Sequence, residues 1–491
     1  MKLLKRYPFF LPLIIVFFCL HGFVQSYNFL RLSDLFNAGF TVSIVILFFF
    51  LLIYRFNKNI IFTSLICFYF EVWYLFFGAI QDRIKPPSTF AFFSKYSVLL
   101  PLSVLGFTLY VKFLNHYKLN WPKFLFFINL LFIIYIFIDT ANLIFINSQN
   151  KESNFKLSFQ FSKPVEKPDV YFLLFDGYPS NKELIDSFKF SNKNFTKKLE
   201  NLQFKQLPIS SNYDVTFYSM ASIFNMEYVI EKKNIMHSQS DIGKRLAEIQ
   251  NGTVFKIFDK MGYQIQNNSI FDVANIASLA NDNRFLNGGG VLLTDKIFFN
   301  RIRKDLSVSF FSKFERQFPF FQNLAIYKTR NDNNNIQTKL LASLEFKSKK
   351  PIFSYTHLLM PHEPFYNDSL GNKIDFMKYA YSDKGKIIDF ISYLKYTNSV
   401  IEKIVTAIKS KKPNAIILLM SDHGQRGVDD LEIKGKEKLS NICHVYFPNK
   451  QYGNQLDTIT NVNVFKYLFN TQFKQDFLFN KDTAFVMNND F

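Results

Sequence analysis

Three short motifs place side chains that commonly bind metal ions at or near the ends of apolar runs of strand length. The runs cover residues 170–175, 352–359 and 415–420, and they bring Asp176, then His357 and His362, then Asp422 and His423. Carboxylates and imidazoles together are ligand types that zinc and manganese accept, and no cysteine accompanies them. These residue types therefore support the binding of a divalent metal ion, zinc or manganese.

Parallel strands separated by helices would bring these motifs together. Each run is mainly apolar and lacks a regular polar alternation, which is typical of strands buried on both faces of a sheet. Segments 254–261 and 386–410 have the apolar spacing of helices, and residues 331–335 predict a polar loop. The alternation predicts an α/β domain with a mainly parallel central sheet, and such sheets place their sites at the carboxyl edge. A single Asp-Gly pair after a strand usually marks only a turn, but the coincidence at three strand ends favours one shared site.

Thr216 is a candidate nucleophile because it lies where the segment 212–225 changes from a loop to a helix. The unpaired N–H groups and the positive dipole end of a helix start favour a bound phosphate. A helix N-cap explains a threonine at this position equally well. A threonine hydroxyl needs a metal ion to stabilise its alkoxide, and the strand-end residues would supply that metal. With those residues added, we interpret Thr216 as the nucleophile.

The long apolar segments are confined to the first part of the chain. Of 491 residues, 48% are hydrophobic and 19% aromatic, and the long runs lie before about residue 147. Five of them are close to the ~20 residues that cross ~30 Å of hydrocarbon. They cover 7–24, 38–54, 61–80, 96–113 and 124–146. Lysine and arginine favour the loops on the side of the N-terminus, which predicts a cytoplasmic N-terminus and an extracytoplasmic remainder in a bacterial inner membrane.

Two carboxyl groups, Glu71 and Asp139, fall inside the predicted spans. An ionised carboxylate is costly there, so both side chains should face the bundle interior or the polar interface. A contact with a lipid headgroup and an interhelical hydrogen bond both remain open, and the hydrogen bond is the favoured interpretation.

Charge and cysteine content exclude two classes of protein. The net charge of +19 comes from dispersed lysine and arginine without a nucleic-acid-binding motif, so we assign it to an anionic membrane surface or to an AT-rich genome. Cys443 is the only cysteine after the spans, which excludes a disulfide framework. No small-residue cleavage site follows the first apolar run, so we interpret this run as an uncleaved anchor. The predicted domains are a five-span α-helical membrane domain over 1–147, a linker over 148–168 and an α/β domain over 169–491.

Four motifs together resemble the sulfatase-like branch of the alkaline phosphatase superfamily. They are Asp176-Gly177, Thr216-Phe-Tyr-Ser219, His357 to His362, and Ser421-Asp422-His423-Gly424. The five-span layout is similar to that of lipoteichoic acid synthases and lipid A phosphoethanolamine transferases. The resemblance implies that Asp176, Thr216, Asp422 and His423 are metal ligands. It also implies that His362 binds substrate or a second metal ion, with His357 as its neighbour.

The sequence departs from these families at several positions. Asp176 stands where the phospholipid-dependent transferases usually have a glutamate. The disulfides of the lipid A enzymes are missing, and so is their further histidine beyond the Asp-His-Gly motif. His444 lies in an expected strand and is interpreted as structural. We therefore expect one divalent metal ion, zinc or manganese, and leave a second ion open.

The resemblance implies transfer of a phosphoethanolamine or phosphoglycerol group from a membrane phospholipid donor to a glycan or lipid acceptor, through a phosphothreonine. A phosphodiesterase or phosphatase that uses water is the alternative, and a non-catalytic membrane scaffold is the third hypothesis. A conventional sulfatase is not expected, because the segment that begins at Thr216 lacks the residues from which formylglycine is made. The chain is expected to act as a monomer without nucleic acid.

Overall fold

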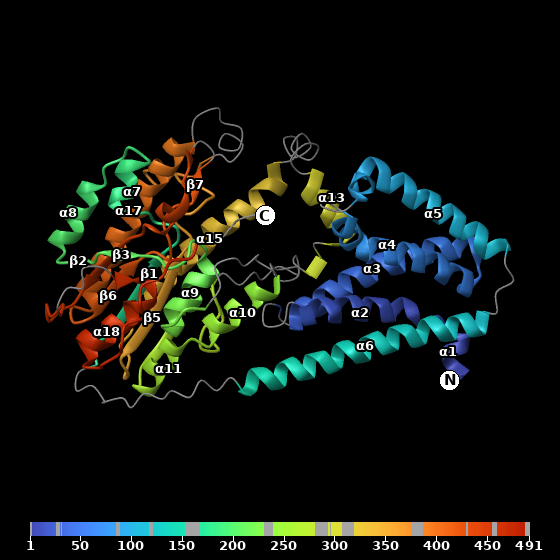
Figure 1. Cartoon of the computed structure of the whole chain (residues 1–491), viewed down its shortest axis with the longest axis horizontal. Coiled ribbons are helices and arrows are strands. Elements are labelled where there is room, and N and C mark those ends of the chain that lie inside the picture. Colours follow the sequence, from blue (N-terminus) through green and yellow to red (C-terminus); the bar gives the residue numbers. More distant parts are fainter. Residues whose placement is uncertain are drawn as a thin grey trace. The chain divides into compact units, whose positions relative to one another are not determined.

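The structure is a computed structural model whose contacts divide the chain into two units, each described by itself (Figure 1). The structure describes residues 2–25, 30, 32–84, 89–116, 121–152, 167–229, 239–279, 293–294, 296–306, 319–374, 386–428, 431–453 and 459–486. The first unit comprises Met1–Leu157 and Asp282–Phe314, and the second comprises Ser158–Asn281 and Glu315–Phe491.

The first unit is built from apolar helices. A short helix α1 (Lys2–Arg6) precedes α2 (Phe10–Gln25), α3 (Leu32–Asn57), α4 (Ile60–Ile84), α5 (Tyr96–His116) and α6 (Trp121–Glu152), with the 3-10 turn η1 (Ala91–Ser94) before α5. Four of the helices, α3 to α6, are long and apolar enough to cross a membrane. Helix α2 has 16 residues, which at a rise of ~1.5 Å per residue falls short of ~30 Å of hydrocarbon. The predicted layout of apolar helices is confirmed, with the first span shorter than the others.

A segment from the range predicted to be catalytic belongs to the first unit and packs on helix α4. Helix α13 (Phe298–Leu306) places Phe298 against Trp73 and Phe77 of α4, with ring centroids 4.2 Å and 4.9 Å away. The backbone approaches closely at Gly78, whose N–H donates to the carbonyl of Lys296 over 2.8 Å. A Cβ at Gly78 would lie 2.7 Å from the Lys296 Cα, so only glycine permits this contact. Residues 282–314 thus belong to the first unit, and the second unit is made of the two segments on either side of them. The sequence analysis predicts instead one continuous domain over residues 169–491.

The second unit contains a six-stranded sheet in the order β2-β9-β6-β1-β5-β4. Strands β4 (Gln264–Asn268), β5 (Ile352–Leu358), β1 (Val170–Phe175) and β6 (Ile416–Met420) are parallel, while β9 (Cys443–Tyr446) and β2 (Lys205–Gln206) are antiparallel to their neighbours. The predicted α/β fold with a mainly parallel sheet is confirmed, and the three apolar runs form its adjacent strands β5, β1 and β6.

Helices cover both faces of this sheet, which is why β1 and β6 are apolar throughout and all of β5 is buried. On one face, Phe172 packs against Phe224 of α9 (Thr216–Asn225) and Phe465 of α18 (Val464–Phe473). Helix α11 (Thr253–Lys260) joins them through Phe258, which stacks on Phe353. On the other face, Tyr171, Leu173 and Phe175 share a core with α17 (Lys386–Lys411) and α15 (Pro319–Ser343). Because both faces of these strands are buried, apolar side chains are favoured on both sides of the sheet.

The remaining elements connect these layers or lie at their margins. They are α7 (Asn181–Asp186), α8 (Lys193–Asn201), β3 (Ile209–Ser210), α10 (Gln239–Gln250), β7 (Gly427–Val428), β8 (Leu431–Glu432), η3 (Gly435–Leu439), β10 (Ile459–Thr460) and η4 (Asn461–Asn463).

The predicted polar loop at 331–335 is wrong, because these residues lie within helix α15. The burial of Asn333 explains why this polar segment is a packed helix and not a loop. Its amide nitrogen donates to the carbonyl of Leu359 over 3.0 Å, and its amide oxygen accepts from the N–H of Leu359 over 2.9 Å. The polar side chain therefore satisfies the backbone just beyond β5, a tertiary contact that has no local sequence signal.

Candidate active site

The carboxyl ends of β1 and β6 bring three predicted metal ligands together. Asp176 follows β1, and Asp422 and His423 follow its parallel neighbour β6. One ligand atom from each of the three residues lies within 4.8 Å of the other two, and all three side chains are buried. The N–H of Gly177, which has a φ of 68°, donates to the Asp422 carboxylate over 3.1 Å and joins the two strand ends. Residues 246 positions apart are thus neighbours, as the sheet topology predicts.

The donor set of this cluster fits a divalent metal ion. Asp176 Oδ1 and Asp422 Oδ2 are buried without a hydrogen-bond partner. His423 Nδ1 donates to the Gly424 carbonyl over 2.7 Å, which leaves the Nε2 lone pair directed at Asp422, 3.2 Å away, and Asp176, 3.8 Å away. Metal-binding histidines commonly have this arrangement, with the second ring nitrogen donating to a carbonyl. Asp176, Asp422 and His423 would hold the ion.

The surrounding imidazoles determine the ionisation of Asp176. Burial alone would raise the pKa of this carboxyl group, but the positive charge that His362, His357 and His423 can carry outweighs the burial and holds the pKa below its ordinary value. The carboxylate is therefore the favoured form, which is also the form that binds metal.

Thr216 lies beside the cluster at the first residue of α9. Its Oγ1 is 3.2 Å from His423 Nε2. The N-cap is Val215, which makes no side-chain capping bond, so the alternative role of Thr216 as a helix cap does not describe this structure. The hydroxyl instead faces the ligand set, while the first turn of the helix provides N–H groups without intrahelical partners.

Three polar side chains fasten the loop after β6. Ser211 Oγ, Ser219 Oγ and Asn461 Nδ2 all donate to the carbonyl of Asp422, over 2.6, 2.7 and 2.7 Å. Because Ser219 lies one turn after Thr216, its bond also joins α9 to the metal-ligand loop. Sequence analysis noted Ser219 only as part of a motif and missed Ser211 and Asn461, whose roles depend on tertiary contacts. Together they hold α9, which begins at Thr216, against the segment that carries Asp422 and His423.

Glycine is required at position 424 by a close approach of the backbone. A Cβ there would lie 2.4 Å from the Ser440 carbonyl, and the Gly424 N–H donates to the Lys438 carbonyl over 2.9 Å. The segment containing η3 therefore packs directly on the Asp-His-Gly motif.

His357 lies behind the ligand set and does not line an open surface. It is fully buried, its Nε2 is 3.4 Å from Asp176 Oδ2, and its Nδ1 is 2.8 Å from the Tyr355 hydroxyl. The substrate-binding role expected for His357 stays a prediction. The position suits a side chain that orients Asp176.

His362 is partly exposed and contacts a residue that sequence analysis did not select. Its Nδ1 donates to the Glu363 carbonyl over 2.7 Å, so Nε2 accepts from Arg426 Nη2 over 3.1 Å. A Cβ at Gly177 would meet His362 Cδ2 at 3.7 Å and His423 Cε1 at 3.8 Å, which places His362 next to the ligand set. A sequence signal that could have drawn attention to Arg426 is its position three residues after His423.

His444 lies in β9, away from these contacts, as expected for a structural residue. Burial lowers the pKa of His444 to about 4, so it is neutral near pH 7. Burial also raises the pKa of the neighbouring Cys443 to about 12, so the thiol is unreactive.

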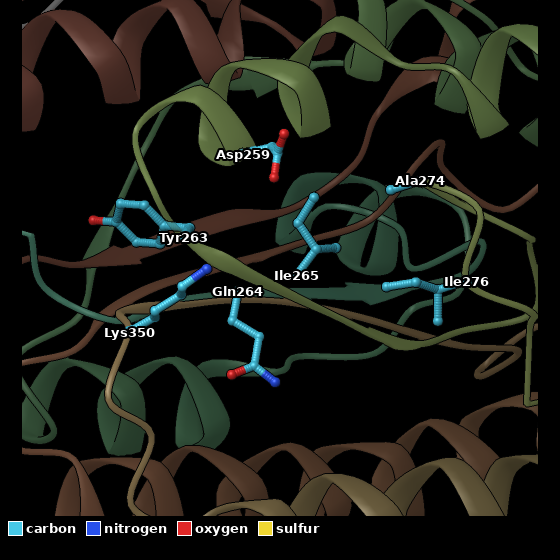
Figure 2. A pocket seen from close by; sticks show the side chains of 7 residues that line it. All are labelled: Asp259, Tyr263, Gln264, Ile265, Ala274, Ile276 and Lys350. Carbon is cyan, nitrogen blue, oxygen red and sulfur yellow. The ribbon is translucent and has the colours of Figure 1, made fainter.

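A separate open cavity of 420 Å³ lies at the edge strand β4 (Figure 2). Its lining residues are Asp259, Tyr263, Gln264, Ile265, Ala274, Ile276 and Lys350. None of them belongs to the ligand set, so the cavity is separate from the site.

The family model described as Sulfatase matches residues 190–491, more than half of the chain. The chain belongs to the sulfatase family. The matched range contains Thr216, His362, Asp422 and His423 and begins after Asp176. The predicted membership of the sulfatase-like branch of the alkaline phosphatase superfamily is confirmed, and with it the general enzyme class.

Solved structures similar to this sulfatase-family chain include phosphoethanolamine transferases and a hydrolase. The C-terminal periplasmic domain of EptC from Escherichia coli has 10% identity and a TM-score of 0.38, covering 64% of this chain and 84% of that one. The corresponding domain of the phosphoethanolamine transferase EptC from Campylobacter jejuni has 14% identity and a TM-score of 0.36, covering 62% and 88%. The phosphonate monoester hydrolase of Agrobacterium radiobacter has 12% identity and a TM-score of 0.38, covering 62% and 73%. A search of curated proteins finds no match.

Proposed function

We propose that this sulfatase-family enzyme transfers a phosphoethanolamine or phosphoglycerol group from a membrane phospholipid to a cell-envelope glycan or lipid. The observation that carries the proposal is the 3.2 Å distance between Thr216 Oγ1 and His423 Nε2, within a site that also contains Asp176 and Asp422. A hydroxyl beside two carboxylates and an imidazole, all suited to one divalent ion, is the arrangement of an activated oxygen nucleophile.

The reaction takes place in two displacements. Thr216 Oγ attacks the phosphorus of a phosphodiester, a new O–P bond forms, and the P–O bond to diacylglycerol breaks. The hydroxyl proton of Thr216 leaves to solvent, and the departing diacylglycerol oxygen takes a proton from solvent. The oxygen of an acceptor hydroxyl then attacks the phosphothreonine and forms a new O–P bond. The bond from phosphorus to Thr216 breaks, the acceptor proton leaves to solvent, and the Thr216 oxygen takes a proton from solvent. A bound zinc or manganese ion would stabilise the threonine alkoxide and the charge on the phosphoryl oxygens.

The chain's own residues orient these steps. Ser219 holds α9 against the carbonyl of Asp422, so the nucleophile and the ligand loop move together. The start of α9 presents N–H groups and a positive dipole end to the phosphoryl oxygens. His357 keeps Asp176 in place from behind.

The apolar helices of the first unit would keep the site in the same membrane as its lipid donor. The distribution of lysine and arginine supports a cytoplasmic N-terminus and an extracytoplasmic catalytic unit in a bacterial inner membrane. We propose that the chain acts as a monomer, with a phospholipid donor and a glycan or lipid acceptor.

The decisive test is the mass of the intact protein after incubation with vesicles of phosphatidylethanolamine or phosphatidylglycerol. The added mass is expected to equal phosphoethanolamine or phosphoglycerol, to map to Thr216, and to be absent from Thr216→Ala. Label from phosphatidylethanolamine that appears only as soluble phosphoethanolamine would indicate hydrolysis instead. Purified protein that binds neither zinc nor manganese, or Thr216→Ala with unchanged activity, would favour the non-catalytic scaffold.

A further inference from the structure

The cavity beside β4 lies at the opposite edge of the sheet from the metal ligands. Gln264 and Ile265 begin β4 and pair in parallel with Ile352 and Phe353 at the start of β5. The metal ligands instead follow the carboxyl ends of β1 and β6. The volume of this cavity, 420 Å³, lies within the range of ~300–1,000 Å³ that is usual for pockets that bind small molecules. It is therefore a candidate binding site apart from the reaction centre.

A turn in an unfavourable backbone conformation forms one wall of this cavity. Ala274 and Asn275 have φ angles of 49° and 62°, in the left-handed region that is costly for alanine. The N–H of Ala274 donates to the carbonyl of Gln250 over 2.9 Å, and Val273 and Ile276 exchange two backbone hydrogen bonds of 3.1 and 2.7 Å. These bonds fix the turn and leave Ile276 36% exposed at the cavity. Backbone strain of this kind is concentrated at positions that hold ligands.

Two side chains of opposite charge line the same cavity. Asp259 lies in the last turn of α11, and Lys350 precedes β5. Both are exposed, and within the described part of the chain neither side chain forms a hydrogen bond or an ion pair. Figure 2 shows the two charged groups at separate positions around the cavity, with Ile265 and Ile276 beside them. The cavity thus offers one negative charge, one positive charge and an apolar wall to a ligand.

The two charges determine the class of ligand that fits. A simple anion would be attracted by Lys350 and repelled by Asp259, and a simple cation would meet the reverse. A zwitterion with an ammonium group and a phosphate a few bonds apart complements both residues. Its methylene groups would contact Ile265 and Ile276. The phosphoethanolamine headgroup has this pattern of charge and apolar carbon.

The cavity also adjoins the point at which the chain enters the second unit. Tyr263, which lines the cavity, donates its hydroxyl to the carbonyl of Pro168 over 2.9 Å. Lys167 Nζ donates to the carbonyl of Met261 over 2.8 Å. Pro168 lies 16 positions after Glu152, the last residue of α6, and a chain of that length spans at most about 58 Å. The phospholipids around α6 are therefore a local source of zwitterionic headgroups.

We propose that the cavity beside β4 binds a phosphoethanolamine ester, with Asp259 paired to its ammonium group and Lys350 to its phosphate. The ester comes either from a phospholipid or from a soluble compound. The site is at the amino edge of the sheet and takes no part in the reaction at Thr216. The inference therefore holds or fails independently of the proposed function.

The first test measures binding to the full-length Thr216→Ala protein in detergent by ligand-observed NMR. Glycerophosphoethanolamine is the probe, and glycerol phosphate and ethanolamine each carry one of its charges. The zwitterion is expected to bind more tightly than either half. Asp259→Asn and Lys350→Ala should each raise its Kd by about 3- to 5-fold, the upper range for one exposed ion pair. In Asp259→Asn the zwitterion should also lose its advantage over glycerol phosphate.

Matched controls remove one charge of each sign outside the cavity. Lys349→Ala changes the exposed neighbour of Lys350, and Glu200→Gln changes an exposed carboxylate at the end of α8. Neither should change the Kd of the zwitterion. All four substitutions are at exposed positions, so the melting temperature should stay that of the parent protein. Equal affinity for the zwitterion and its halves, or a Kd that neither cavity variant raises, would overturn the inference.

The second test locates the ligand and identifies its source by limited acetylation of the wild-type protein. Lys349 and Lys350 are adjacent and both exposed, so tandem mass spectrometry can compare their rates in one experiment. Slower acetylation of Lys350 alone in vesicles of phosphatidylethanolamine, but not of phosphatidylglycerol, would assign the ligand to the lipid. Protection only by added glycerophosphoethanolamine would assign it to a soluble ester. Protection of Lys350 by neither would contradict the proposed site.

Discussion

Both units bury carboxyl groups, but among the described residues only those of the second unit form a cluster with a histidine. Asp176 and Asp422 lie with His423 so that a ligand atom of each is within 4.8 Å of the others. In the first unit, Glu71 is fully buried in α4 and neither of its oxygens has a hydrogen-bond partner. Asp139 of α6 instead pairs with His21, 3.1 Å away. The interhelical hydrogen bond expected for these two residues is therefore present for Asp139 and not for Glu71.

The two sets of buried acids differ in clustering and not in burial, and we expect the clustered set to be the functional one. An isolated buried acid can avoid its desolvation cost by remaining neutral. Two carboxylates in contact repel each other when both are ionised, and a cation removes that repulsion. The predictions below compare clustered and isolated groups, in order of decreasing effect.

Removal of the metal ion should have the largest effect, because it acts on the clustered carboxylates. Chelation is expected to lower activity by at least about 10³-fold, since the threonine alkoxide loses its stabilisation. It should also lower the melting temperature, because an ion that binds only the folded state at ~1,000 times its Kd contributes about 4 kcal/mol. Activity and scanning fluorimetry before and after addition of zinc or manganese measure both effects.

Asp422→Asn provides the matched variant for chelation. It keeps the side-chain shape, and its melting temperature should no longer respond to metal. A chelated wild type with full activity and an unchanged melting temperature would contradict the metal site.

His444 tests an isolated buried group in the second unit. Its pKa is about 4 in the folded protein against an ordinary 6.5. Above the ordinary pKa both states are neutral and the folded state has its full stability. As the pH falls from the ordinary pKa of 6.5 to the folded-state pKa of about 4, His444 takes up a proton in the unfolded chain but not in the folded chain. The free energy of unfolding therefore decreases by about 3 kcal/mol in total. Melting temperatures measured between pH 7 and pH 5 should therefore fall.

His444→Gln is the control for this pH dependence, because glutamine does not titrate. Its melting temperature is expected to fall less over the same range, whatever its absolute value. Identical pH slopes in the two proteins would show that His444 is not the titrating group.

Arg301 tests the contact between α13 and α4, where the charge is paired. Its Nη2 donates to Asp82 over 2.6 Å and its Nε donates to Gln81 over 2.9 Å. Arg301→Ala should destabilise the contact by about 1–3 kcal/mol, because it leaves polar partners unsatisfied. Hydrogen exchange of residues 298–306 should then become faster. A double-mutant cycle with Asp82→Ala isolates the pair, and a coupling energy of zero would contradict its contribution.

The sequence predicted the strands and site residues that depend on the apolar or polar character of neighbouring residues in the chain. The apolar runs predicted β1, β5 and β6, and the position of Asp422 and His423 directly after β6 followed from the length of that run. The contacts of Asn333, Asn461 and Arg426 could not be predicted, because each joins segments that are distant in the chain. The docking of α13 likewise depends on the absence of a side chain at Gly78, in another part of the sequence.

Glu71→Gln should have the smallest effect and completes the comparison. Glutamine has nearly the same shape, and neither Glu71 oxygen has a hydrogen-bond partner that the change would remove. Activity and melting temperature in detergent are expected to stay close to those of the wild type. Glu71→Lys, which places a permanent charge at the same buried position, should be strongly destabilised. A large loss of activity in Glu71→Gln with an unchanged melting temperature would instead mean that the ionised carboxylate contacts a cation, such as the ammonium group of a lipid.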